Sequence, residues 1–129
     1  MKTIGILSDT HATWDERFAE HFVGCDEIWH AGDIGSEEVI NRLEKLAPVH
    51  AVAGNIDGMV LRRRFGLEQE WVTDGVKVYM THIGGYPGKY APGVKFKLET
   101  RRPKIFVCGH SHILKVMYDR EHSLLHINP

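Results

Sequence analysis

Short apolar runs that each end in a polar side chain are the feature that most constrains the fold of this chain. The first run, Thr3 to Leu7, stops at Ser8 and Asp9, and His11 follows two residues later. Runs of this length bounded by turn residues are typical of buried strands. Ligands of open α/β sheets collect just beyond the carboxyl ends of the strands, so we expect Asp9 and His11 to stand at a functional site.

The first half of the chain predicts an alternation of strands and helices. A capping box of Thr13 and Glu16 predicts a helix that begins at Thr13 and ends at Gly24. The next predicted elements are a strand at Glu27–Ala31 followed by Gly32-Asp33, a helix at Ser36–Leu46 stopped by Pro48, and a strand at Val49–Ala53 followed by Gly54-Asn55. Short crossovers of this kind make neighbouring parallel strands, so the fold class is α/β.

The second half has a different pattern. We expect 59–67 to be irregular and 84–93 to be a Gly/Pro/Tyr loop, whereas 94–102 fits a helix or a strand equally well. The predicted strands are a hairpin of Glu70–Thr73 and Val76–Met80 across Asp74-Gly75, a buried strand at Lys104–Cys108, and a last hairpin of Ile113–Tyr118 and Ser123–Ile127.

Composition excludes several classes of protein. The 129 residues suit a single domain spanning 1–129, and 43% hydrophobic with 26% charged residues is typical of a soluble globular protein. A formal net charge of −1 argues against a general nucleic-acid binder. The polar break at Ser8 makes the N-terminus too short for a signal peptide or membrane span, so we expect a cytoplasmic protein. We expect Cys25 and Cys108 to be reduced packing residues.

Seven polar side chains follow the predicted strands. They are Asp9, His11, Asp33, Asn55, His82, His110 and His112. Each alone is a weak signal, but together they cannot share one site without cations, because two carboxylates repel and four imidazoles lack acceptors. Two divalent ions resolve this conflict. Mixed imidazole and carboxylate ligands suit manganese, zinc, iron, cobalt or nickel better than calcium.

The order of these motifs resembles the calcineurin-like metallophosphoesterase superfamily, in particular its small microbial phosphodiesterases. The shared motifs are Asp9-Thr10-His11, Gly32-Asp33, Gly54-Asn55, His82 and Gly109-His110-Ser111-His112. The resemblance implies a two-sheet αββα sandwich that binds two divalent metal ions, with manganese as our first choice. It also implies the ligand sets: Asp9, His11 and His112 for one ion, Asn55, His82 and His110 for the other, and Asp33 as the bridge between them.

The implied activity is hydrolysis of small phosphate diesters by a metal-bridging hydroxide, with Asp33, Asn55 and Asp57 as catalytic residues. Two divalent ions, two carboxylates and a hydroxide leave a site charge of roughly +1, which suits a diester monoanion. Two alternatives stay open. One is a phosphomonoesterase or nucleotidase on the same site, and the other is a non-catalytic interaction scaffold, because a retromer subunit shares the fold. A homo-oligomer is also possible.

The chain departs from the family at Ile56, where many members have a histidine proposed to protonate the leaving group. An alkyl side chain cannot donate a proton, so we expect weaker action on poor leaving groups. In the family an Asn-Pro pair such as Asn128-Pro129 usually leads into further strands, whose absence would expose a sheet edge.

Other polar residues have less specific interpretations. We expect His30 to be a core residue or a support for a ligand, His50 to be structural, and His21, His122 and His126 to be surface or packing residues. We expect the run Arg62–Arg64 to be exposed to solvent rather than to bind a phosphate. Tyr86, Lys89 and Tyr90 stand in the loop after His82, where they could cover a substrate or contact a second subunit.

Overall fold

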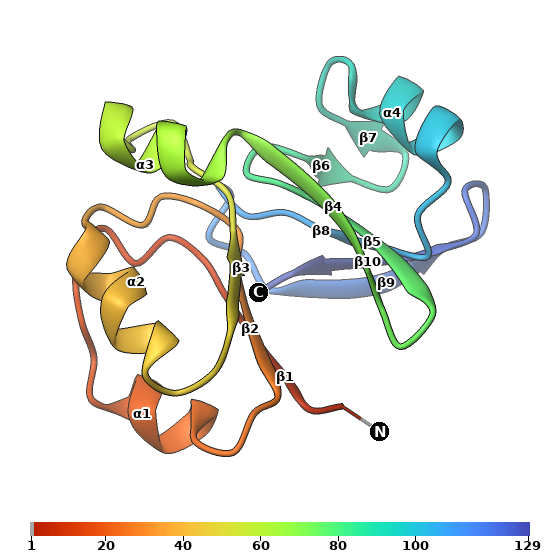
Figure 1. Cartoon of the computed structure of the whole chain (residues 1–129). Helices are drawn as coiled ribbons and strands as arrows, with labels where there is room; N and C mark the ends of the chain where they lie inside the picture. Colours follow the sequence, from red (N-terminus) through yellow and green to blue (C-terminus); the bar gives the residue numbers. More distant parts are fainter. Residues whose placement is uncertain (1) are drawn as a thin grey trace.

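The computed structural model describes residues 2–129, and its first half is a parallel sheet with the order β1-β2-β3 (Figure 1). The strands pair in parallel, with Ile6 opposite Trp29 and Trp29 opposite His50. Two helices connect them. The elements are β1 (Ile4–Leu7), α1 (Arg17–Phe22), β2 (Glu27–His30), α2 (Glu37–Glu44) and β3 (Val49–Ala51).

The second half forms a mixed five-stranded sheet with the order β4-β5-β8-β10-β9 and a small separate hairpin. β5, β8 and β10 run parallel to one another, whereas β4 and β9 pair antiparallel at the two edges. The elements are α3 (Met59–Phe65), β4 (Glu68–Thr73), β5 (Val76–Thr81), β6 (Gly85–Tyr86), β7 (Lys89–Tyr90), α4 (Val94–Arg101), β8 (Ile105–Val107), β9 (Lys115–Asp119) and β10 (Leu124–Asn128).

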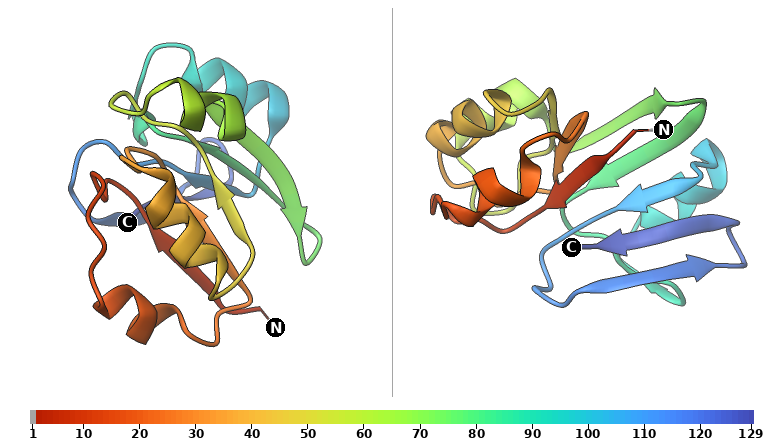
Figure 2. Two further views of the ribbon diagram at one scale, coloured as in Figure 1. Left: turned by 60° about the vertical axis from the view of Figure 1, so that its left-hand side comes forward. Right: turned by 90° about the horizontal axis from the view of Figure 1, so that it is seen from below.

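The two sheets pack face to face, with helices on both outer sides, which gives the predicted αββα layers (Figure 2). Side chains alternate along β2 because successive residues of a strand point to opposite faces. Ile28 packs under the helices of the first sheet, and Trp29 packs between the sheets against Val78 and Val107. The outer face of the second sheet buries Phe106 under α4. Both faces of the central strands are therefore covered.

The prediction for the first helix was wrong at its start. α1 begins at Arg17, and Glu16 occupies the N-cap position without a side-chain cap. Thr13 instead donates its backbone N–H to the carbonyl of Thr10 at 2.9 Å. The carboxylate of Asp15 accepts a hydrogen bond from the backbone N–H of Arg17 at 2.9 Å. Asp15 therefore caps the start of the helix in place of Thr13.

The segment expected to be irregular forms α3, which Gly66 terminates with a positive φ of 74°. The ambiguous segment 94–102 is helical, and its Val94 and Leu98 are buried. The expected loop 84–93 carries the short β6–β7 hairpin. Both predicted hairpins are confirmed. No helix among residues 2–129 is both long and apolar enough to cross a bilayer.

Candidate metal centre

The carboxyl ends of the strands from both sheets converge, and backbone hydrogen bonds join the turns that follow them. The N–H of Asp9 donates to the carbonyl of Gly32 at 2.8 Å, and the N–H of His11 donates to the carbonyl of Asp33 at 3.0 Å. In the second sheet, the N–H of Gly109 donates to the carbonyl of His82 at 2.8 Å. These bonds hold together the turns within each sheet, and the seven predicted side chains meet at this edge of the sandwich.

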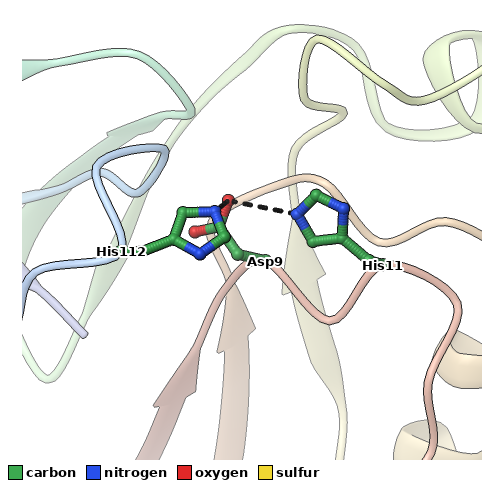
Figure 3. Close-up of side chains that lie close together, drawn as sticks. All are labelled: Asp9, His11 and His112. Carbon is green, nitrogen blue, oxygen red and sulfur yellow. Dashed lines mark ion pairs between the residues drawn. The ribbon is translucent and has the colours of Figure 1, made fainter.

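One group at this edge consists of Asp9, His11 and His112 (Figure 3). Oδ1 of Asp9 lies 3.4 Å from Nε2 of His112 and 4.0 Å from Nε2 of His11. Ligand atoms of the three residues all lie within 4.8 Å of one another. Two nitrogens on a tetrahedral ion stand about 3.3 Å apart, given ligand bonds of ~2.0–2.1 Å, so the spacing fits a shared cation.

A second group consists of Asp33, His82 and His110, with Asn55 beside them. Oδ2 of Asp33 lies 3.1 Å from Nε2 of His82 and 3.7 Å from Nε2 of His11. The carboxylate of Asp33 therefore faces both groups. Its side chain and that of His82 are each 3% exposed, whereas His11 and His112 are 43% and 58% exposed. The centre is thus buried on one side and open to solvent on the other.

One buried oxygen shows that this set of side chains fits a cation. Oδ2 of Asp9 accepts hydrogen bonds from the hydroxyl of Ser8 at 2.6 Å and the N–H of His110 at 3.1 Å, but its Oδ1 is buried with no hydrogen-bond partner. The side-chain amide of Asn55 has one terminal atom 3.0 Å from Nε2 of His82 and 3.3 Å from both oxygens of Asp33, which places it within the second group. A buried carboxylate oxygen without a hydrogen-bond donor is unfavourable unless a cation stands beside it.

The backbone at the centre is strained. Non-glycine residues rarely adopt positive φ, because the Cβ atom then approaches the backbone. Five of the seven predicted ligands have a φ between 47° and 74°, namely Asp9, His11, Asp33, His110 and His112. Such conformations cost about 1–3 kcal/mol each and cluster at functional sites. The fold holds these side chains in place at the expense of its own stability.

The Gly54-Asn55 motif needs a glycine because the backbone of this residue lies very close to Asp33. A Cβ atom on Gly54 would lie 2.1 Å from Oδ1 of Asp33 and 2.3 Å from its backbone nitrogen. Real Cβ contacts are never this short, so only glycine lets the third strand end against Asp33. The N–H of Ile56 in the same turn donates to Oδ1 of Asp33 at 3.1 Å.

His30 supports the centre from the core. It is completely buried, and its Nδ1 accepts the N–H of Gly32 at 3.1 Å, so a neutral ring carries its proton on Nε2. That atom lies 3.0 Å from the hydroxyl oxygen of Thr10, which in turn donates to the carbonyl of Ile34 at 2.9 Å. Burial lowers the pKa of His30 to about 4. A neutral His30 thus ties together the turns that follow β1 and β2.

Asp57, predicted to be catalytic, is 3% exposed, and its carboxylate accepts hydrogen bonds from three backbone N–H groups. Its Oδ2 accepts from Gly54 at 2.8 Å and Ile34 at 3.1 Å, and its Oδ1 accepts from Gly35 at 2.8 Å. Residue Asp57 therefore clamps the turns that carry Asp33 and Asn55. On this geometry we assign it a positioning role and no direct contact with substrate.

Arg62, Arg64, His50 and His122 have structural partners. The Nε–H of Arg62 donates to the carbonyl of Asp57 at 2.9 Å, and Arg64 pairs with Glu44. His50 stacks on Trp71 with ring centroids 4.2 Å apart. The Nδ1 atom of His122 lies 2.9 Å from the carboxylate of Asp119.

Asn128 was missed as a support of the centre. Its buried amide donates to the carbonyl of Gly109 at 3.2 Å and to the hydroxyl of Ser111 at 3.0 Å, and so holds the turn that carries His110 and His112. No local pattern points to this role, because Asn128 meets these partners only when β8 and β10 pair.

Comparison with known proteins agrees with this geometry. The family model described as the calcineurin-like phosphoesterase superfamily domain matches residues 1–129. A probable metallophosphoesterase from Methanothermobacter thermautotrophicus is 29% identical over 118 residues, covering 84% of this chain and 66% of the relative. The chain spans only 58–66% of the length of the curated relatives that it matches.

Solved structures share the fold. A novel archaeal phosphodiesterase has a TM-score of 0.76 and 26% identity, covering 100% of this chain and 83% of its own. The zinc complex of Vps29 from Entamoeba histolytica has a TM-score of 0.78 and 18% identity, covering 98% of this chain and 72% of its own. Family model, curated relative and motif order agree, and the chain belongs to the calcineurin-like phosphoesterase superfamily.

Proposed function

We propose that the protein is a metal-dependent phosphoesterase that hydrolyses phosphate diesters. The observation that carries this proposal is the pair of buried carboxylates, Asp9 and Asp33, faced by the Nε2 atoms of His11, His82 and His112 at 3.1–4.0 Å. An interaction surface needs no such arrangement. Buried carboxylates facing imidazole nitrogens are what a dinuclear site requires.

In this proposal Asp9, His11 and His112 hold one divalent ion, and Asn55, His82 and His110 hold the other. Asp33 would contribute to both sets, because its carboxylate faces both groups. When bound, two such ions lower the pKa of water and neutralise charge on the phosphoryl oxygens. Two divalent ions outweigh the charges of Asp9 and Asp33, so the loaded site attracts an anionic ester.

The chain's own groups prepare the site for this chemistry. Ser8 and the N–H of His110 hold one oxygen of Asp9, which leaves the other free for a cation. The N–H of Ile56 holds one oxygen of Asp33 in the same way. These contacts fix both carboxylates before a ligand arrives, so binding costs little reorganisation.

Two features favour a diester with a good leaving group. The archaeal phosphodiesterase, at 26% identity, is similar along the whole of this chain. Ile56 follows Asn55 directly and is 47% exposed, but its alkyl side chain cannot protonate a departing alkoxide. Esters whose leaving group is stable as an anion need no such proton. We expect aryl diesters to be hydrolysed faster than alkyl diesters.

The test is hydrolysis of an aryl diester and an aryl monoester by protein treated with a chelator. We expect no activity without metal, recovery with manganese, and a higher kcat/KM for the diester. His82→Gln should lower kcat/KM by at least ~100-fold, because it removes a ligand. His21→Gln, which alters a histidine of α1 outside both ligand groups, should leave the activity unchanged. Activity that is unchanged by chelator treatment would overturn the proposal.

A monoesterase on the same site would reverse the order of the two substrates in this test. A scaffold of the Vps29 kind is the remaining alternative, since that protein shares the fold. A scaffold predicts no hydrolysis with any of manganese, nickel or zinc.

A further inference from the structure

An open groove of about 310 Å³ lies between the start of α2 and the start of α3. Its walls come from two segments, residues 35–37 and residues 58–61, and we call it the α3 groove. Asp57 joins these segments, because its Oδ1 accepts the N–H of Gly35 at 2.8 Å and Gly58 follows it in the chain. The α3 groove is therefore framed by the turns that carry Asp33 and Asn55.

A run of exposed apolar side chains leads from the candidate metal centre to this groove. Ile56 follows the predicted ligand Asn55 and is 47% exposed. Its N–H donates to Oδ1 of Asp33 at 3.1 Å, so the run begins beside the central carboxylate. Met59 and Val60, which line the groove, are 65% and 61% exposed.

This run is unusual for the exposed side of a helix. Leu61 forms the buried side of α3 and belongs to the core under the first sheet. A surface helix normally places polar residues on the opposite side. Arg63 and Arg64 follow this rule, but the first turn of α3 exposes Met59 and Val60 instead. Contiguous exposed apolar side chains of this kind mark binding sites.

The α3 groove can accept an uncharged group without burying an unpaired charge. Glu37 contributes a charged side chain to the lining, and its carboxylate lies 3.7 Å from the guanidinium of Arg64. The space at Gly58 is open, because a Cβ atom on this residue would meet no heavy atom within 4 Å. Apolar contacts therefore dominate what the groove offers to a ligand.

We propose that the α3 groove binds the organic part of the phosphate ester, and that this part is an extended apolar group of about two linked rings. The inference rests on the proposed function, because that function places the phosphate at the metal centre beside Asn55. Ile56 contacts the portion next to the phosphate, whereas Met59 and Val60 contact the far portion. A sugar, whose hydroxyls need hydrogen-bond partners, would gain little from these side chains.

The dimensions of the groove select the length of the substituent. Gly58 lies three residues beyond Asn55, so the two residues are at most about 10 Å apart. One ring attached to phosphorus covers only part of this span, and two linked rings cover more of it. An apolar cavity of about 150 Å³ in another protein accommodates benzene, so about 310 Å³ has room for roughly two rings.

The test compares phosphonates, which carry one organic group and cannot be hydrolysed. Zinc-loaded protein is titrated with methylphosphonate, phenylphosphonate and biphenylphosphonate. We expect biphenylphosphonate to bind at least about tenfold more tightly than phenylphosphonate, because a second ring leaves water. A phenylphosphonate with a carboxamide in place of the second ring should show no such gain.

NMR of the methionine methyl groups locates the second ring. The Met59 signal, assigned by its loss in Met59→Gln, should move with biphenylphosphonate and stay in place with methylphosphonate. The signal of the completely buried Met80 should stay in place with both compounds. A Met59 signal that biphenylphosphonate leaves in place overturns the proposal.

A double substitution, Met59→Gln with Val60→Thr, makes the groove polar without changing its charge and with little change in shape. Both side chains are exposed, so the variant should fold, and circular dichroism checks this. It should lose most of the preference for the biphenyl compound. The matched control is Val72→Thr with Phe96→Gln, at apolar positions 66% and 71% exposed outside the groove, and it should keep the preference.

Equal affinity of the wild-type protein for all three phosphonates overturns the proposal, as does a biphenyl preference that survives the double substitution. Failure of the proposed function gives a different result. Protein that binds biphenylphosphonate selectively but hydrolyses no ester would keep the α3 groove as a ligand site and remove the enzyme. Protein that hydrolyses diesters without any preference for apolar substituents would keep the enzyme and remove this inference.

Discussion

Nδ1 of His82 lies 2.7 Å from the carbonyl oxygen of Ala31, across the interface between the two sheets. A carbonyl can only accept, so this nitrogen carries the proton and Nε2 presents its lone pair. Nε2 lies 3.1 Å from Oδ2 of Asp33. The contact thus sets the tautomer that a metal ligand needs, and it depends on the packing of one sheet against the other.

Gly54→Ala should damage both the fold and metal binding, because the new Cβ would lie 2.1 Å from Oδ1 of Asp33. We expect a loss of about 3 kcal/mol in the free energy of unfolding, measured with urea, and weaker zinc binding by calorimetry. Gly58→Ala is the matched control, since its Cβ would meet no heavy atom within 4 Å. Equal effects of the two substitutions would contradict the close approach.

Asp57→Asn separates positioning from catalysis. An amide has one acceptor oxygen and cannot serve all three backbone donors, so we expect a loss of about 3 kcal/mol in stability. Because the displaced turns carry Asp33 and Asn55, the variant should need more metal, and excess manganese should restore most of kcat. If saturating metal left kcat low in folded protein, Asp57 would have a direct part in the reaction.

The sequence predicted the elements that strong local patterns specify. The Asp74-Gly75 turn predicted the β4–β5 hairpin, and the segment Ser36–Leu46 stopped by Pro48 predicted α2. The seven polar side chains were expected at one place because parallel strands end at the same edge of a sheet, and the structure brings them together.

The remaining features depend on contacts between distant residues. α3 was missed because its basic run resembled a solvated loop, although its Leu61 is buried in the core and Gly66 ends the helix. The capping box failed because Asp15 competes with Thr13 for the start of α1. The support that Asn128 gives to the turn of His110 needs the pairing of β8 with β10, which no local pattern encodes.

Ile56→His should raise the rate on an unactivated alkyl diester, because an imidazole beside Asn55 could protonate the leaving group. The Ile56 side chain is 47% exposed, so the change should cost little stability. We expect an increase of about tenfold or more in kcat for the alkyl diester, and a much smaller one for an aryl diester. An unchanged rate on the alkyl diester would refute the idea that the site lacks an acid.

His126→Phe should stabilise the protein, and more so in acid. Both ring nitrogens of His126 are buried without partners among Tyr86, Tyr90 and Phe106. We expect a gain of about 1–2 kcal/mol at pH 8, since no buried polar group is left unpaired.

Burial lowers the pKa of His126 from 6.5 to about 4, so between these values the unfolded chain binds more protons than the folded one. The wild-type protein should therefore lose stability as the pH falls from 6.5 towards 4, and the variant should lose less. Urea unfolding at pH 8 and pH 5 measures the free energy of unfolding of both proteins. A difference in stability that does not grow at pH 5 would contradict this assignment.

The pair of cations is tested most directly by anomalous diffraction from crystals soaked in manganese. We predict two peaks about 3.5–4 Å apart. One should touch Asp9, His11 and His112, the other Asn55, His82 and His110, and Asp33 should contact both. A single peak, or none among these side chains at saturating metal, would contradict the account.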